Sequence, residues 1–375
     1  MKVLFSTTSG AGHYRPLFPI ASALVRSGHE VLFACPETSA GAISEAGFGA
    51  RAFDEAEPTD EQRALFEQAA ATGDPSLGEK AVGIGFGYVS PRAALPRLET
   101  VMGEGSFDLV VRDPGEMASL VICERDGLPS VIGMGGLQSA FGLLGGLVAE
   151  PLSRLRTLVG VPDPGTMATD ALILTPTPES FDEPSDLPTE VLRYGLGTPL
   201  RDVPPDGPVY ATLGTEVMSF FGGPRLLRTI LEALADLELA AVVTTGVDPA
   251  EIGLPATPPS IEVRKFVSHS QVIPSSRAVI THGGAGTVQD AIVMGRPMVV
   301  LPQFADQPAN GRRVEEVGIG RVLGVDEQTV DNLRSAVRDV LSGGYDRSSK
   351  ALAEEAAGLP PIDSLVERLE LVAGR

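Results

Sequence analysis

The segment spanning residues 278–323 constrains the fold of this chain more than any other. It begins as a short apolar run, is interrupted by glycines, and resumes as an amphipathic pattern from Val288 to Met294. This order predicts a strand, a tight turn and a helix. The free N–H groups of such a turn and the positive end of the helix favour an anion, for which a diphosphate is the natural candidate. The turn consists of His282, Gly283, Gly284, Ala285, Gly286 and Thr287.

A second apolar run at residues 297–301 leads into the sequence Phe304-Ala305-Asp306-Gln307. Open α/β sheets bind their ligands beyond the carboxyl ends of the strands. Asp306 and Gln307 therefore stand where a carboxylate and an amide suit sugar hydroxyls, and we expect them to bind the sugar.

The motifs HGGAGT and GRPMVVLPQFADQ, followed by residues 310–320, resemble the nucleotide-sugar signature of the UDP-glycosyltransferase-like superfamily, especially its actinobacterial members that glycosylate antibiotics and other natural products. The alternative is an ordinary glycine-rich turn in an unrelated Rossmann-like protein. The order and spacing of the motifs over about 45 residues are more specific than a lone glycine motif. The resemblance implies an α/β GT-B fold: two Rossmann-like domains with a cleft between them and a C-terminal helix packing back on the N-terminal domain.

The length of 375 residues favours two domains, each able to bury its own core. Prolines are dense between residues 176 and 208 and place the interdomain linker at 197–207. We expect an acceptor-binding domain at 1–200, a nucleotide-sugar-binding domain at 207–358, and a returning helix at 359–375.

Composition excludes several classes of partner. A net charge of −20 opposes binding to nucleic acid or anionic lipid. No segment is apolar for long enough to span a membrane, and residues 131–148, the nearest candidate, contain many glycines and are expected to form a pocket-lining loop. Cys35 and Cys123 indicate neither a disulfide framework nor a zinc site. The N-terminal apolar run is too short for a signal peptide, so we expect a cytoplasmic protein.

The first loop carries the candidate base. A strand at residues 2–7 leads into Gly10-Ala11-Gly12-His13-Tyr14-Arg15, where arginine replaces the third glycine of a dinucleotide motif, which disfavours a nicotinamide enzyme. The sequence Gly12-His13-Tyr14-Arg15-Pro16 is similar to the setting in which natural-product glycosyltransferases carry their catalytic histidine. The alternative role for His13 is to cap the helix that Pro16 begins.

Asp113 follows a strand at residues 107–112 and should reach the same sheet edge as His13. A carboxylate there can accept the imidazole N–H, fix the tautomer, and leave the other ring nitrogen as a base. The superfamily pairs its histidine with an aspartate at a matching place. The alternative is that Asp113 only caps the helix beginning near Gly115.

The resemblance also implies the remaining contacts. Thr215 would meet the donor phosphate, Phe266 and Val267 the base, and Asp290 the ribose. Phe266 replaces the tryptophan that plant relatives stack on uracil, so the base preference stays open. Residues expected on the acceptor side are Gly12, Tyr14, Met134 and Gln138.

The expected activity is inverting transfer of a sugar or deoxysugar from a dTDP- or UDP-sugar to a small lipophilic natural product, with His13 as general base and neither metal nor other cofactor. The expected partners are the nucleotide-sugar donor and a small-molecule acceptor. Two alternatives are a nucleotide-sugar epimerase and a non-catalytic nucleotide-sugar-binding auxiliary protein. The donor sugar, the acceptor, the linkage and the oligomeric state, for which a homodimer is one option, stay open.

Overall fold

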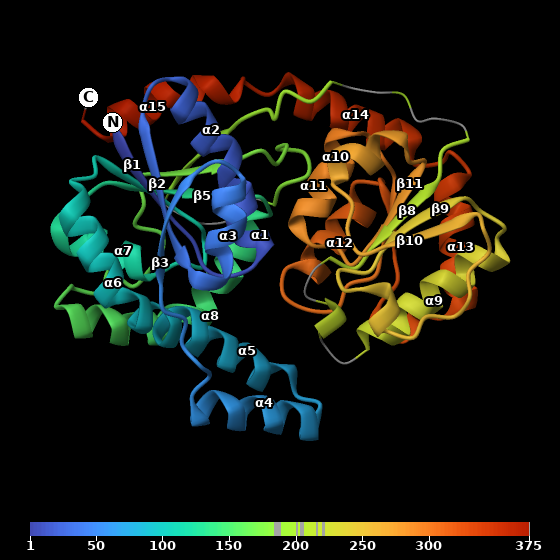
Figure 1. Cartoon of the computed structure of the whole chain (residues 1–375), viewed down its shortest axis with the longest axis horizontal. Helices are drawn as coiled ribbons and strands as arrows, with labels where there is room; N and C mark the ends of the chain where they lie inside the picture. The colour runs from blue at the N-terminus through green and yellow to red at the C-terminus, as the bar shows by residue number, and fades with distance from the viewer. Residues whose placement is uncertain (184–188, 200–201, 203–205, 215–216, 220–221, 375) are drawn as a thin grey trace.

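The computed structural model describes residues 1–183, 189–199, 202, 206–214, 217–219 and 222–374. Two α/β halves lie side by side, each built on its own parallel sheet (Figure 1). The arrangement confirms the predicted GT-B fold class. The predicted linker at 197–207 falls partly outside the described residues, and the exact domain boundaries stay a prediction.

The N-terminal sheet has seven strands in the order β3-β2-β1-β4-β5-β6-β7. The central strands are short runs in which every side chain is buried, as expected for parallel sheets covered by helices on both faces. The strands are β1 Lys2–Ser6, β2 Glu30–Pro36, β3 Gly49–Phe53, β4 Leu109–Arg112, β5 Ser130–Gly133, β6 Leu172–Thr175 and β7 Glu190–Arg193.

Helices cover both faces of this sheet, and α4 and α5 extend away from it (Figure 1). Thr59 and Gln62 form a capping box that starts α4, and Asp74 followed by proline starts α5. The helices are α1 Ala11–Tyr14, α2 Phe18–Arg26, α3 Glu37–Glu45, α4 Asp60–Thr72, α5 Pro75–Ile84, α6 Ser90–Gly105, α7 Ala118–Asp126 and α8 Gln138–Val159, with a π-helical turn at Gly85–Val89.

The expectation of a loop over residues 131–148 is wrong, because helix α8 begins at Gln138. The Asp182 carboxylate accepts the Gln138 backbone N–H at 2.9 Å and holds the start of the helix. Phe141, Val148 and Leu152 then bury one face of α8 in the core over the sheet. Across the described part of the chain, no helix is long and apolar enough to cross a membrane.

The C-terminal sheet has six parallel strands in the order β10-β9-β8-β11-β12-β13. The strands are β8 Val209–Thr212, β9 Ala241–Thr244, β10 Ile261–Arg264, β11 Ala278–Thr281, β12 Met298–Val300 and β13 Gly320–Val322. The helices are α9 Gly223–Asp236, α10 His269–Val272, α11 Ala285–Val293, α12 Gln307–Glu316, α13 Val330–Leu341 and α14 Asp346–Gly358.

The last helix, α15 Leu365–Val372, returns to the N-terminal half (Figure 1). Leu365, Val366 and Leu369 are buried in the same apolar cluster as Leu17 and Leu24. The predicted packing of the C-terminal helix on the N-terminal domain is therefore confirmed.

Candidate active site

His13 and Asp113 meet at the carboxyl edge of the N-terminal sheet. Strands β1 and β4 are neighbours in a register that pairs Ser6 with Arg112, so both chains leave the sheet together. A turn with Gly10 at φ 96° then starts the short helix α1. His13 Nδ1 lies 2.9 Å from Asp113 Oδ1. The predicted contact between the two side chains is present.

Backbone donors fix the Asp113 carboxylate, which is fully buried. Thr8 N–H donates to Oδ2 at 2.6 Å and Gly115 N–H to Oδ1 at 2.8 Å. Burial alone would raise the pKa of Asp113, but the charge and hydrogen bond of His13 and these backbone donors together hold the pKa below its ordinary value. Because the carboxylate accepts from Nδ1–H, the neutral form of the imidazole has its lone pair on Nε2.

A cavity of about 230 Å³ opens beside this pair. Thr8 and Gly115, whose N–H groups hold Asp113, belong to its wall, and the Phe86 ring lies 5.8 Å from the His13 ring. The apolar part of the wall is formed by Phe53, Phe66, Ala81, Val82, Phe86, Pro91, Ala94 and Met117. An apolar molecule in this cavity would lie near the histidine, although neither His13 nor Asp113 is part of the wall.

The four residues predicted on the acceptor side are not part of this wall. Tyr14 packs on Phe18 with the ring centroids 5.6 Å apart, and Met134 is buried in the core. The amide of Gln138 donates to Asp182 at 2.7 Å, and Gly12 lies within α1. Their role in acceptor binding stays a prediction.

The glycine turn begins helix α11 at the edge of the C-terminal sheet. Gly283 has φ 90°, and a Cβ on it would lie 2.7 Å from Val300. A Cβ on Gly284 would lie 2.4 Å from the His282 ring, so neither position accepts a side chain without movement. Gly286 is exposed and Thr287 is buried. The helix points its positive end at the space beside Gly286.

His282 sits between two glycine turns, because a Cβ on Gly214 would also touch its ring at 2.7 Å. Burial lowers the pKa of His282 to about 4, a hydrogen bond with the Thr212 backbone opposes this, and the charge of His269 adds to it. The side chain is therefore neutral at physiological pH. Thr215, the other predicted phosphate contact, lies outside the described residues.

The side chains of Asp306 and Gln307 both accept hydrogen bonds from neighbouring residues. Asp306 Oδ2 accepts from Asn310 Nδ2 at 2.8 Å and from Ala285 N–H at 3.3 Å. Burial raises the pKa of Asp306, although these donors and the nearby charge of His13 oppose the rise. Gln307 Oε1 accepts from the Gln303 N–H at 2.9 Å, which joins the two ends of the loop at 303–307. The charge of His13 acts on Asp306, although the two residues belong to different halves.

The predicted base site also joins the two halves. Phe266 is 54% exposed, and the Arg15 guanidinium of the first loop lies 5.3 Å from its ring centroid. Val267 is buried. Asp290 Oδ2 contacts His269 Nδ1 at 2.7 Å. No structural observation assigns the base or ribose role, so these three assignments stay predictions.

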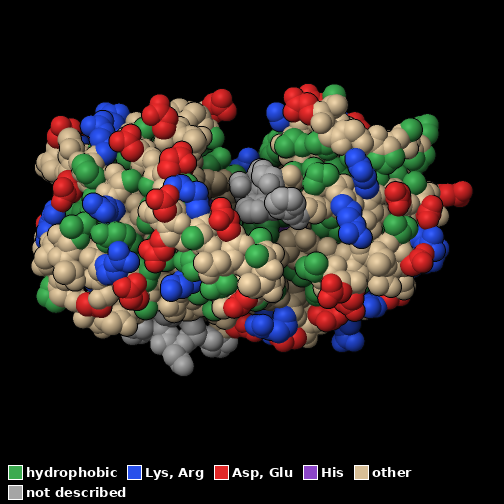
Figure 2. All heavy atoms as spheres, turned by 90° about the horizontal axis from the view of Figure 1, so that it is seen from below, with side chains coloured by type: hydrophobic (Ala, Val, Ile, Leu, Met, Phe, Trp, Pro, Cys, Tyr) green, Lys and Arg blue, Asp and Glu red, His purple; other side chains and the backbone are tan. Residues whose placement is uncertain are grey.

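The surface around the site carries both signs of charge. Figure 2 shows two lobes with a groove between them, and on this face Lys and Arg are interspersed with Asp and Glu. Within the described ranges, no group of three or more His, Cys, Asp or Glu could hold a metal ion.

Known proteins resemble both the C-terminal half and the whole chain. Residues 228–372 match the family described as erythromycin biosynthesis protein CIII-like, C-terminal domain. The chain is 28% identical to L-demethylnoviosyl transferase of Streptomyces niveus, with 98% of this chain and 97% of that protein covered. It is 29% identical to 10-deoxymethynolide desosaminyltransferase of Streptomyces venezuelae, with 100% and 98% covered.

A solved structure extends the likeness to the fold. The spinosyn rhamnosyltransferase SpnG with spinosyn aglycone matches with a TM-score of 0.81 at 24% identity, and the match covers 99% of this chain and 100% of that one. SpnG has also been solved in complex with thymidine diphosphate.

Proposed function

We propose that this chain, a glycosyltransferase with the GT-B fold whose residues 228–372 match the erythromycin biosynthesis protein CIII-like C-terminal domain, catalyses an inverting transfer from a nucleoside diphosphate sugar to a small natural-product aglycone. The observation that carries the proposal is the His13–Asp113 pair, which lies beside an apolar cavity and whose charge acts on Asp306 of the other half. Relatives named for aglycone glycosylation support the substrate class. The thymidine diphosphate complex of SpnG supports dTDP as the nucleotide.

Each group has one role in the proposed displacement. His13 Nε2 takes the proton of an acceptor hydroxyl, and the oxygen attacks the anomeric carbon from the face opposite the diphosphate. The bond from that carbon to the diphosphate oxygen breaks, and its electron pair leaves with the diphosphate. Asp113 stabilises the imidazolium, and the N–H groups at the start of α11 stabilise the leaving anion. This proposal requires neither a metal nor another cofactor.

The cavity beside His13 also suggests the charge of the acceptor. Its ionisable wall residues are Asp54, Glu55 and Glu116, and none of its described wall residues is a lysine or arginine. An acceptor carboxylate would be desolvated beside like charges there, which is unfavourable. We therefore expect neutral or cationic aglycones to be used and carboxylates to be rejected.

A substrate screen tests the proposal. The full chain would be incubated with dTDP- and UDP-sugars and a panel of apolar hydroxylated aglycones, each carboxylate paired with its methyl ester, and products detected by mass spectrometry. We expect transfer with an inverted anomeric configuration by NMR and a preference for the esters.

The same screen separates the alternatives. Labelled donor without acceptor should be recovered unchanged. Its conversion to an epimer would replace the proposal by an epimerase, and donor binding without transfer to any acceptor would indicate the auxiliary protein.

A further inference from the structure

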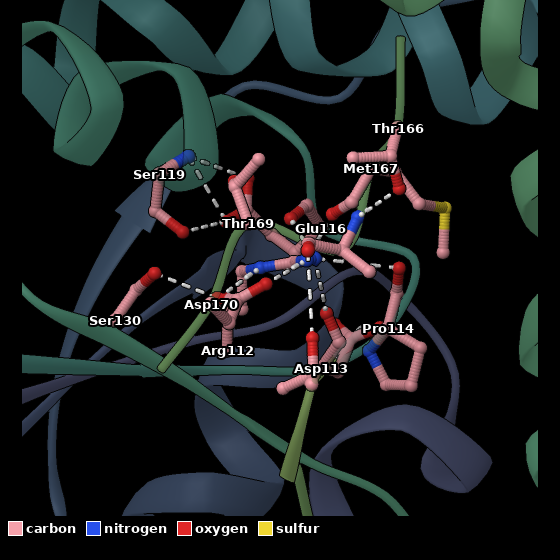
Figure 3. A network of polar contacts seen from close by, with 12 residues as sticks. Arg112, Asp113, Pro114, Glu116, Ser119, Ser130, Thr166, Met167, Thr169 and Asp170 are labelled. Atoms are coloured by element: carbon pink, nitrogen blue, oxygen red, sulfur yellow. Dashed lines mark hydrogen bonds and ion pairs between the residues drawn. The ribbon is translucent and has the colours of Figure 1, made fainter. Parts of the chain in front are cut away.

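A buried arginine lies directly behind the catalytic pair. Arg112, the last residue of β4, is fully buried, and its side chain is held by Asp170 through two hydrogen bonds (Figure 3). Nε lies 3.0 Å from Asp170 Oδ1 and Nη2 lies 2.6 Å from Oδ2. Ser130 Oγ donates to the same carboxylate at 2.7 Å. Asp170 is thereby fixed to β5, and the planar guanidinium is fixed to Asp170.

The third guanidinium nitrogen points at the loop that carries Asp113. Arg112 Nη1 donates to the backbone carbonyls of Asp113 at 3.3 Å, Pro114 at 3.4 Å and Glu116 at 3.1 Å (Figure 3). One cation therefore satisfies three carbonyls within four residues of chain. The Asp113 carbonyl also accepts the Glu116 backbone N–H at 3.2 Å, but no strand that the structure describes pairs with this loop to supply donors to the other two carbonyls.

The far end of the loop is fixed as well. The Glu116 carboxylate accepts from the Ala118 N–H at 2.8 Å and from Ser119, and so caps helix α7. Within the loop, Gly115 N–H donates to Asp113 Oδ1, the oxygen that also contacts His13. A shift of the loop backbone would therefore move the Asp113 carboxylate relative to the imidazole.

We propose that Arg112 is a positioning residue of the transfer reaction: through the carbonyls of residues 113–116 it holds the Asp113 carboxylate where that group orients the His13 ring. This inference rests on the proposed roles of His13 and Asp113. Replacing a buried ion pair by apolar residues of similar volume often costs no stability, so stability alone does not account for this arginine.

The charges around the arginine agree with this role. Burial lowers the pKa of Arg112, but the carboxylates of Asp170, Glu116 and Asp113 outweigh it and hold the pKa above its ordinary value. The side chain therefore remains a cation behind the catalytic pair. Burial also raises the pKa of Glu116.

The test removes both buried charges together. Arg112→Gln combined with Asp170→Asn removes the ion pair as a unit, while Asp113 and Glu116 keep their direct hydrogen-bond donors, so the variant should fold, and thermal melting would establish this. Its kcat with dTDP-glucose and 4-methylumbelliferone should fall about 10- to 100-fold because misplaced groups react slowly. KM for dTDP-glucose should change less than about two-fold, because uniform donor binding is untouched. If the double variant does not fold, Arg112→Lys takes its place, because it keeps the buried cation but lacks the planar fork that reaches Asp170 and the three carbonyls together, and the same direction is expected.

A second readout needs no substrate. The chain has four histidines, so the full protein labelled with ¹⁵N-histidine gives few signals, and His13→Gln assigns that of His13. We expect a fixed Nδ1–H tautomer in the native protein and a mixture of tautomers in the double variant. The acid limb of the pH–rate profile should move in the same variant.

Arg156→Gln is the matched control. Arg156 is also buried and bonded through two nitrogens to one carboxylate, that of Glu124 at 2.9 and 2.6 Å, and it contacts the backbone at Thr166. Its polar contacts are with Glu124, Asp163 and Thr166, outside the loop of residues 113–116. Arg156→Gln should retain the native tautomer and at least about half of the native kcat, because Arg156 does not contact the loop that carries Asp113.

Two results would overturn the inference: a folded double variant with native tautomer and kcat, or the same tautomer change in Arg156→Gln. Retained activity in His13→Ala would instead remove the proposed function, while the tautomer readout would still decide whether Arg112 positions Asp113.

Discussion

Each half of the molecule contains one histidine–aspartate pair, and the two pairs are nearly equal in length. Nδ1 lies 2.9 Å from the carboxylate in His13–Asp113 and 2.7 Å in His269–Asp290. Their surroundings differ, because the Asp113 side chain is fully buried whereas that of Asp290 is 43% exposed. Asp113 is also held by backbone donors from two loops.

The difference shows that distance alone does not make a catalytic pair. An exposed pair is screened by water and contributes little, whereas a buried carboxylate with fixed donors keeps its charge and its direction. The apolar cavity whose wall includes Thr8, Phe86 and Gly115 lies beside the N-terminal pair. We therefore expect His13–Asp113 to act in the chemical step and His269–Asp290 to act, at most, in donor binding.

The largest effect is expected when the N-terminal pair is removed. His13→Ala should lower kcat about 10²- to 10⁴-fold, the scale of a general base, with donor affinity nearly unchanged. His269→Ala is the control and should keep kcat within about three-fold, since an exposed pair contributes little. Steady-state kinetics and calorimetric titration with dTDP measure the two quantities. Equal losses of kcat in both variants would abolish the distinction between the pairs.

His282, which belongs to neither pair, is expected to affect the pH dependence of stability. Because its folded pKa of about 4 lies below the ordinary 6.5, the unfolded chain takes up the proton first as the pH falls. The contribution to stability is complete above about pH 6.5 and is lost between there and about pH 4, by at most about 3 kcal/mol. His282→Gln should flatten this part of the pH dependence in urea unfolding. An unchanged slope in that variant would show that His282 is already solvated.

Asp113→Asn should lower kcat about 10- to 100-fold, because the variant keeps a hydrogen-bond acceptor but loses the charge that stabilises the imidazolium. The acid limb of its pH–rate profile should shift. Asp290→Asn should leave the profile where it is. The assignment of His13 and Asp113 as a catalytic pair fails if neither variant shifts the acid limb. It also fails if both variants shift it.

Asp306, in the C-terminal half, should decide which sugar is recognised. Asp306→Ala should weaken use of the nucleotide sugar about 10-fold, the cost of one hydrogen bond to a charged group. Binding of free dTDP should change much less. Equal losses for the two ligands would assign Asp306 to the diphosphate or to the loop that it holds with Asn310.

The smallest effect is expected at the exposed pair. Asp290→Asn should raise KM for the donor about two- to five-fold and leave kcat unchanged, as for other exposed charged contacts. Kinetics at 50 and 500 mM salt would sharpen the result, since screening should reduce the difference between variant and native protein. A change in kcat instead would give the C-terminal pair a place in the chemistry.

The sequence predicted those parts of the site that local patterns encode. The glycine turn at 282–287 is recognised from its composition, and Asp113 directly follows a predictable strand. Parallel topology then places both at the carboxyl edges of the sheets. Helix α8 was missed because its glycines at 142, 145 and 146 weaken the helical pattern. Its start is held by Asp182, which is 44 residues away in the chain.

The residues around the pair were harder to predict. Phe66 reaches the cavity from α4 and Phe86 reaches it from the π-helical turn, and no local pattern encodes how these elements come together. Arg112 appears as one more residue of a strand, and its partner Asp170 lies 58 residues further along. Such contacts become visible only once the tertiary fold is known.

The return of α15 has a consequence for how the protein is made. A ribosome delivers the N-terminal sheet first, yet Leu365, Val366 and Leu369, which complete one of its apolar clusters, are synthesised nearly at the end. That face of the N-terminal half therefore stays uncovered until almost the whole chain has left the ribosome. Expression of residues 1–200 alone would leave the same face open to solvent, and a fragment for biophysical work should carry the returning helix with it.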